Sequence, residues 1–262
     1  GRRATALLQV KIPYFHVDAF AARTFGGNPA GVCLLDGWLN DATLLNIAAE
    51  NRHSETAFLV TRGADYELRW FTPTVEMDLC GHATLAAAFV IFTQVDRQRT
   101  SVRFHSRSGE LSVARDGELL TLDFPSRPAV ACAAPDALVR GLGARPVEVF
   151  KSRDYLVVFN DEAEIRVLKP DFATLAQLDC TGIICTARGT DCDFVSRFFA
   201  PQAGVDEDPV TGSAHCTLIP FWAARLGKVK LFARQVSQRG GELFCELAGD
   251  RVRIGGKAVL YL

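Results

Sequence analysis

The chain has 262 residues, of which 48% are hydrophobic, and its 29 basic and 30 acidic side chains leave a formal net charge of −1. A near-neutral chain without a basic stripe lacks the electrostatic footprint of a nucleic-acid-binding protein. Its longest apolar run, over 83–93, is too short to cross a bilayer. The composition is typical of a soluble globular protein, so we expect a cytoplasmic location and neither a nucleic-acid nor a membrane partner.

The predicted elements of the first half are short strands and one helix. Residues 11–20 are predicted to form a strand. A helix begins at Asn40 or Asp41, since either side chain can cap its first turn. Two further strands are predicted over 56–61 and 66–71.

The second half repeats this order. A helix is predicted over 169–178, and strands over 182–187 and 193–199. The triplet Ala-Thr-Leu occurs at the helix of both halves, in 42–44 and in 173–175. The chain is therefore expected to consist of two similar units.

A proline-rich connector separates the two halves. Three prolines within 125–135 make this segment stiff and poorly helical, so we place the boundary near Ser126. The predicted domains are 1–125 and 126–262, and the final strands, which alternate as a hairpin over 242–262, can cross between them.

A longer motif is also duplicated. Residues 61–83 and 187–214 share an Arg-Gly pair, a further arginine, a Phe and a Pro, and a closing Gly-X-Ala. Duplicated halves usually face each other across a cleft. Differences between the two copies at that cleft therefore indicate where the chemistry lies.

Each copy of the motif leads into a helix that is apolar on nearly all sides. These helices begin at His82 and Ser213, and such a pattern predicts burial inside a curled sheet. Pro220 is expected to kink or restart the second helix. Gly81 and Gly212 precede the two helices and allow close backbone approach, while the free N–H groups and the helix dipole favour an anion. The pattern predicts one cleft that binds a carboxylate or a developing enolate.

Acidic residues near the motif are candidates for proton transfer. Aligning Ser54-Glu55-Thr56 with Cys180-Thr181-Gly182 leaves Glu55 at the start of a buried strand in one half only. Partial burial would raise the pKa of Glu55 and suit it to general acid/base catalysis. Asp208, directly ahead of the second helix, is a second candidate. His82 is predicted to be an exposed site residue at its helix start.

The other acidic residues and the cysteines carry less information. Glu76 and Glu207 are interpreted as solvated loop charges or helix caps. Eight cysteines in a chain this long do not predict a disulfide framework. The cluster of Cys180, Cys185 and Cys192 fits no zinc spacing, so we expect no bound metal.

Several motifs together resemble the phenazine-biosynthesis PhzF-like family. They are V-D-A-F, F-G-G-N-P-A-G-V-C, S-E-T-A-F, L-C-G-H-A-T-L-A-A-A and E-D-P-V-T-G-S-A-H, and they span Val17 to His215. The resemblance implies an α/β (α+β) diaminopimelate-epimerase-like fold. That fold has two pseudo-symmetric domains, each a curled, mainly antiparallel sheet around a central helix, with the active site between them.

The resemblance also implies a cofactor-independent isomerase, typically a homodimer, that moves a proton between carbons of a small carboxylate-bearing substrate. The matching positions give Glu55 the role of proton shuttle. His82, Asp208 and Ser213 would hold or polarise the substrate. Gly81 and Gly212 would contribute backbone contacts.

Two alternatives remain open at this stage. Racemases of the wider superfamily use two cysteines, but Cys80 is matched here by Thr211, whose hydroxyl is too weakly acidic to replace a thiol. A one-thiol epimerase, with Glu55 opposite Cys80, is still possible, as is a non-catalytic binding protein that retains the fold. Cys80 is otherwise interpreted as a small apolar filler.

Overall fold

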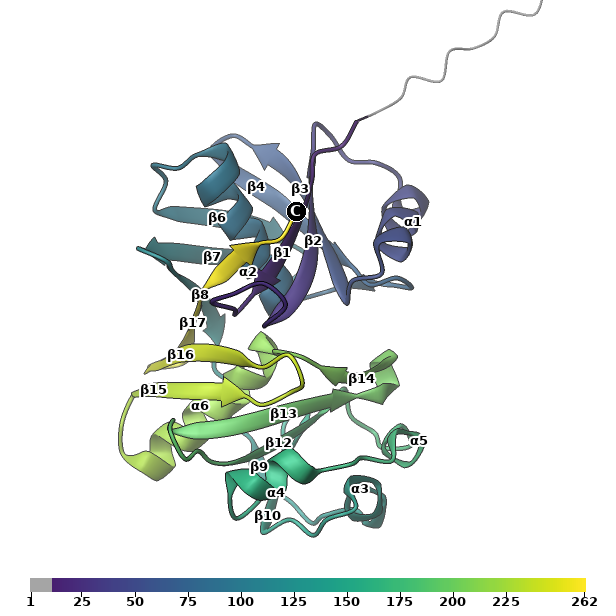
Figure 1. Cartoon of the computed structure of the whole chain (residues 1–262), viewed down its shortest axis with the longest axis vertical. Coiled ribbons are helices and arrows are strands. Elements are labelled where there is room, and N and C mark those ends of the chain that lie inside the picture. The colour runs from purple at the N-terminus through teal and green to yellow at the C-terminus, as the bar shows by residue number, and fades with distance from the viewer. Residues whose placement is uncertain (1–10) are drawn as a thin grey trace, which may run out of the picture.

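The computed structural model describes residues 11–262 and shows two lobes stacked along the long axis of the molecule (Figure 1). The upper lobe contains β1 (Tyr14–Ala19), β2 (Asn28–Leu35), β3 (Glu55–Arg62), β4 (Asp65–Phe71), β5 (Glu76–Met77), β6 (Ser101–Ser106), β7 (Gly109–Asp116) and β8 (Leu119–Pro125). Its helices are α1 (Asp41–Asn51) and α2 (Gly81–Val90), which continues as a π-helical turn over Ile91–Val95.

The lower lobe is built from the following part of the chain. Its strands are β9 (Val130–Ala131), β10 (Glu148–Lys151), β11 (Tyr155–Val158), β12 (Ile183–Arg188), β13 (Phe194–Ala200), β14 (Val205–Asp208), β15 (Lys230–Gln235) and β16 (Gly241–Ala248). Its helices are α3 (Asp136–Leu142), α4 (Glu162–Val167), α5 (Phe172–Leu175) and α6 (Gly212–Leu226), with a 3-10 turn over Pro201–Ala203. The short α5 replaces the longer helix predicted over 169–178, and the sequence reading missed α3 and α4.

The duplication seen in the sequence is also a duplication of topology. In the upper lobe β2 runs parallel to β3, and β4 runs parallel to β6, while most other neighbours are antiparallel. In the lower lobe β11 is parallel to β12, and β13 is parallel to β15. Each parallel pair is joined through a helical connection, and the connections of the second pairs contain α2 and α6.

The last strands return from the lower lobe to the upper one. β17 (Arg251–Gly256) pairs with β16 on one side and with β8 on the other, and β18 (Ala258–Leu260) pairs with β1. The final strands thus pair with both lobes. The domain boundary near Ser126 stays a prediction.

The two apolar helices lie inside their lobes, as predicted. Every residue of α2 except Phe89 is buried, and α2 contacts β1, β2, β3 and β8. α6 contacts β15, β16 and β17. Within residues 11–262, no helix has both the length and the apolar character needed to cross a membrane.

Pro220 does not restart α6, which runs on to Leu226. Proline lacks an N–H, so the carbonyl four residues earlier loses its helical partner. That carbonyl belongs to Cys216, and the backbone N–H of Arg127 donates to it at 2.8 Å. The connector between the halves supplies the hydrogen bond that the helix lacks, which explains why the helix continues.

Candidate active site

The starts of α2 and α6 meet between the lobes. A Cβ atom added to Gly81 would lie 3.2 Å from the Cα of Gly212, and one added to Gly212 would lie 3.3 Å from the Cα of Gly81. At these distances a methyl group would fit only if the facing backbone moved by a few tenths of an ångström. The predicted convergence of two helix N-termini is therefore a close backbone contact.

A cavity of about 100 Å³ lies beside this contact. Its polar lining includes Ser54, Glu55, His82, Arg153, Asp208, Thr211 and Ser213, and its apolar lining includes Met77, Leu79, Phe198, Ala200 and Val205. All six of the predicted site residues, namely Glu55, Gly81, His82, Asp208, Gly212 and Ser213, line this one cavity. The structure thus brings them together from both lobes.

The strand register corrects the alignment of Glu55. Phe71 pairs with the residue after Glu55, and its repeat partner Phe199 pairs with the residue after Gly182. Glu55 therefore corresponds to Gly182, and not to Thr181 as the sequence alignment predicted. Residue types alone misplaced this segment by one position because they carry no information on strand pairing.

The second carboxylate is also without an acidic counterpart. Asp208 pairs with Phe198 in the lower lobe, and at the matching place in the upper lobe Met77 pairs with Trp70. At Gly182 an added Cβ would come within 2.2 Å of the Phe198 ring, so a side chain there would require the ring to move. Each lobe consequently contributes one carboxylate to the cavity. The two carboxylates do not occupy corresponding positions of the repeat.

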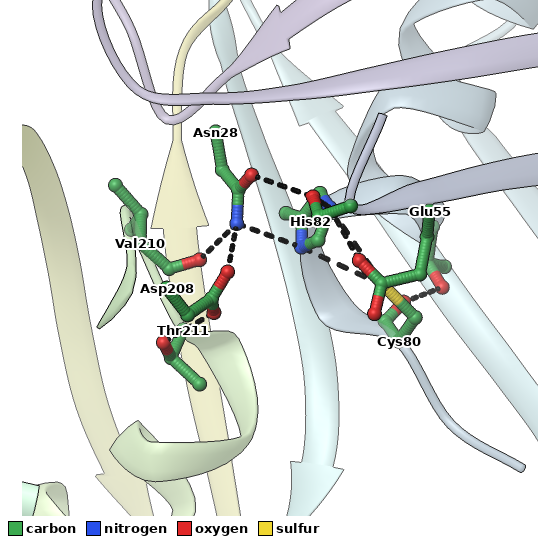
Figure 2. A network of polar contacts seen from close by, with 9 residues as sticks. Asn28, Glu55, Cys80, His82, Asp208, Val210 and Thr211 are labelled. Carbon is green, nitrogen blue, oxygen red and sulfur yellow. Dashed lines mark hydrogen bonds and ion pairs between the residues drawn. The ribbon is translucent and has the colours of Figure 1, made fainter. Parts of the chain in front are cut away.

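His82 is the centre of the polar contacts in Figure 2 and is buried, not exposed as predicted. Its Nε2 lies 3.2 Å from Oε2 of Glu55 and 3.3 Å from Oγ of Ser54. Its Nδ1 lies 3.1 Å from Nδ2 of Asn28 and 3.5 Å from Sγ of Cys80. The imidazole therefore has a possible proton partner at both ring nitrogens.

Asn28 joins the two lobes at this point, and the sequence reading did not single it out. Its fully buried amide nitrogen donates to Oδ1 of Asp208 at 2.7 Å and to the carbonyl of Val210 at 2.9 Å. Its amide oxygen accepts from Oγ of Ser54 at 3.1 Å. The available signal was its place in F-G-G-N-P-A-G-V-C, where one polar side chain stands in an otherwise apolar motif.

Electrostatics give the two carboxylates different protonation behaviour. Burial is the largest single influence on Glu55 and would raise its pKa. The positive charge of His82, together with polar contacts to His82, Ser54 and Cys80, outweighs burial, so the pKa is lowered and our expectation of a raised pKa was wrong. Burial raises the pKa of Asp208 to about 6, and the His82 charge only partly opposes this rise. At neutral pH Glu55 is therefore a carboxylate, while Asp208 titrates close to neutrality.

The protonation state of His82 follows from the groups around it. Burial would lower its pKa, but the Cys80 sulfur and the Glu55 carboxylate raise the pKa well above its usual value. The two hydrogens of the Asn28 amide already have acceptors in Asp208 and the Val210 carbonyl. The proton on Nδ1 can therefore be donated to the Cys80 sulfur, whose own pKa burial raises to about 11. At neutral pH the thiol is uncharged, so the charge that favours an imidazolium at His82 is that of the Glu55 carboxylate.

Each copy of the duplicated motif contains one arginine–glutamate ion pair. Nε and one terminal nitrogen of Arg69 donate to the two carboxylate oxygens of Glu76 at 2.7 and 2.8 Å. Arg197 holds Glu207 in the same way at 2.7 and 2.8 Å. Neither glutamate is the solvated loop charge that we predicted; both fix the short strand that leads into the helix.

Arg153 was also missed by the sequence reading. Its guanidinium lines the cavity, is held by the buried carboxylate of Asp154 at 3.0 Å, and donates to Oγ of Ser213 at 3.3 Å. It lies in the turn between β10 and β11, where a charged residue gives no distinctive sequence signal. A fixed cation thus stands beside the N-terminus of α6.

Acid/base groups on two similar lobes that face one cavity define an enzyme of the isomerase or epimerase type. The chain matches the family of phenazine biosynthesis-like proteins over residues 17–262. It is 55% identical over 253 residues to a Pseudomonas aeruginosa protein named as an uncharacterized isomerase, covering 97% of this chain and 98% of that one. The chain therefore belongs to the phenazine biosynthesis-like family and is an isomerase.

Solved structures agree with this assignment. The crystal structure of a PhzF family protein from Enterococcus faecalis matches with a TM-score of 0.94 and 47% identity, covering 97% of this chain and 98% of that one. A probable proline racemase from Agrobacterium radiobacter matches with a TM-score of 0.64 and 12% identity, covering 96% and 92% of the two chains. The second likeness concerns the fold alone. Together they confirm the predicted epimerase-like fold.

Proposed function

We propose that this isomerase moves a proton between two carbons of a small carboxylate-bearing substrate without a cofactor, and that Glu55 is its acid/base. The observation that carries the proposal is that Glu55 is ionised and buried at the cavity. It is a largely buried carboxylate at the cavity, kept ionised by the His82 charge, and the other lobe has a glycine at the corresponding position. An ionised carboxylate shielded from water is a competent base for an acidified C–H bond.

The substrate's anionic group binds at the helix starts in this proposal. The free N–H groups at Gly81 and Gly212 and the dipoles of α2 and α6 favour a negative charge. Arg153, next to Ser213, adds a full positive charge on the same side. Asp208, with a pKa of about 6, can accept or donate a hydrogen bond to a polar substituent.

The proposed reaction is balanced within one substrate. Glu55 takes a proton from a carbon that is acidified by a neighbouring unsaturated or carbonyl group. The electron pair left on that carbon delocalises toward the anion-binding groups, which stabilise the developing charge. Protonated Glu55 then returns the proton to a second carbon on the same face, so that a double bond moves and nothing is gained or lost.

The test combines a ligand screen with isotope exchange. Small unsaturated carboxylates are screened by thermal shift, and any compound that binds is followed by NMR in deuterated water. We expect deuterium incorporation and double-bond migration, both slowed about 10²–10⁴-fold in Glu55→Gln. Asp78→Asn, which changes an exposed carboxylate of the same motif, is the matched control. Normal turnover by Glu55→Gln would overturn the assignment.

The one-thiol epimerase is less compatible with the geometry. Its mechanism needs Cys80 and Glu55 on opposite faces of a substrate carbon. In the structure the Cys80 and Glu55 ligand atoms lie within 4.8 Å of each other and on the same lobe, which leaves no space for a carbon between them. Epimerisation of an amino or hydroxy acid that disappears in Cys80→Ser would nevertheless restore this mechanism.

A further inference from the structure

Three side chains with different metal-binding groups meet at the cavity. The carboxylate of Glu55, the thiol of Cys80 and the imidazole of His82 each place one donor atom within 4.8 Å of the other two. Among residues 11–262 no other three such side chains meet this closely. In particular, the cysteines near residue 185 do not form such a group.

The separations are close to those of ligands around one tetrahedral zinc ion. Zinc binds sulfur at about 2.3 Å, and nitrogen or oxygen at about 2.0–2.2 Å, which puts its ligand atoms roughly 3.3–3.6 Å apart. Oε2 of Glu55 lies 3.2 Å from Nε2 of His82. Sγ of Cys80 lies 3.5 Å from Nδ1 and 3.9 Å from Nε2 of His82. Nε2 of His82 therefore lies close to a donor atom of each of the other two side chains.

The carboxylate of the cluster already faces a positive charge. Oε2 of Glu55 is buried, and its contact with Nε2 of His82 at 3.2 Å is an ion pair without hydrogen-bond geometry. A buried carboxylate needs a compensating charge, and a bound cation could supply that charge in place of the imidazolium proton.

We propose that Glu55, Cys80 and His82 bind one thiophilic divalent cation, Zn²⁺ being the natural candidate, with a fourth coordination position open to the cavity. A thiolate and a carboxylate together balance the charge of the ion, and binding releases the thiol and imidazolium protons to solvent. The ring nitrogen that is not bound to the ion keeps Ser54 or Asn28 as its neighbour.

The thiolate determines which cations are accepted. Zn²⁺, Co²⁺ and Cd²⁺ suit a sulfur-containing site, whereas Mg²⁺ and Ca²⁺ prefer oxygen ligands. The site goes beyond the proposed function and does not depend on it. A bound ion would occupy the carboxylate of Glu55, so metal binding and proton transfer through Glu55 exclude each other.

The experiment uses Co²⁺ alone as a spectroscopic probe of the full chain. We expect one Co²⁺ per chain, with a thiolate-to-cobalt charge-transfer band, displaced by Zn²⁺ and unaffected by Mg²⁺. Cys80→Ser should remove the band and weaken Co²⁺ binding by more than about 100-fold, because loss of a direct ligand costs more than loss of its supporting contacts. Cys132→Ser, which changes an exposed cysteine outside the cavity, should leave the charge-transfer band and the Co²⁺ affinity unchanged.

A second variant tests the carboxylate. Glu55→Gln should keep the charge-transfer band but weaken Co²⁺ binding, and far-ultraviolet circular dichroism and thermal unfolding establish that each variant is folded. A band that survives in folded Cys80→Ser, unchanged affinity in folded Glu55→Gln, or no band in the parent chain would each overturn the proposal. None of these readouts involves turnover, so they are independent of the isotope-exchange test.

Discussion

The cavity side of the upper lobe and that of the lower lobe share a framework but not their reactive groups. Both have an arginine–glutamate pair, a short strand and a glycine that starts a buried helix. The residues that differ are the reactive ones: Glu55 and Gly182, Met77 and Asp208, Cys80 and Thr211, His82 and Ser213. The duplication therefore preserves what brings the helix starts together, while the acid/base groups are divided unequally between the lobes.

The largest stability effect is expected when either arginine–glutamate pair is broken. Arg69→Met and Arg197→Met each leave a mostly buried glutamate without its bidentate partner. We expect each variant to lower the free energy of unfolding by about 2–4 kcal/mol, with the smaller loss in Arg69→Met because Arg107 still pairs with Glu76 at 2.8 Å. Urea denaturation measures both losses. A large loss in only one variant would contradict the equivalence of the two frameworks.

Asp208 should produce a pH dependence that its counterpart Met77 cannot. Below about pH 4 its carboxyl is protonated in both the folded and unfolded states. As the pH rises toward 6 the unfolded state ionises first, so this group makes the protein less stable, by about 1–3 kcal/mol at pH 7. Asp208→Asn should therefore gain stability relative to the parent between pH 4 and pH 7 in urea denaturation. If the difference in unfolding free energy between Asp208→Asn and the parent stayed constant from pH 4 to pH 7, the raised pKa of Asp208 would be contradicted.

The contact between the helix starts should be sensitive to a single methyl group. Gly81→Ala and Gly212→Ala each force backbone atoms apart, and we expect a loss of about 1–2 kcal/mol and weaker binding of carboxylate ligands. Gly37→Ala is the control, because an added Cβ there meets nothing within 4 Å. Thermal unfolding compares the three variants. Equal midpoints for all of them would show that the contact tolerates a side chain.

The smallest paired effect is expected at two helix caps. Asn40 accepts a hydrogen bond from the N–H of Thr43, and Asp171 accepts one from the N–H of Thr174. Replacing either cap by alanine should cost about 1 kcal/mol, measured by urea denaturation. A substitution by serine, which can still accept the bond, should restore most of the loss in each lobe.

Features with a local sequence cause could be predicted. The burial of α2 and α6 follows from their apolar character on all sides, and the close helix starts follow from two glycines in matched motifs. The cap at Asn40 follows from its side chain and the helix after it. The prediction that Pro220 could restart the helix was wrong because the carbonyl it leaves free is bonded by Arg127, a residue from a different segment.

The remaining parts of the site depend on distances that the sequence does not contain. Asn28 and Asp208 lie 180 positions apart, yet their side chains share a hydrogen bond. The pKa of Glu55 is lowered and not raised because His82 lies next to it, and local burial gave the wrong sign. Arg153 lies outside the duplicated motif of residues 187–214, so the repeat could not reveal it.

The return of the chain after β16 has a consequence for how a substrate reaches the cavity. β17 is hydrogen-bonded to β8 along its whole length, and β18 then joins β1, so each lobe is held by a strand that continues from the other. Separating the lobes as rigid bodies would require this ladder to unzip. Substrate entry and product release are therefore expected to depend on side-chain and turn movements at the rim, such as those of Arg153, while the two helix starts stay in contact during turnover.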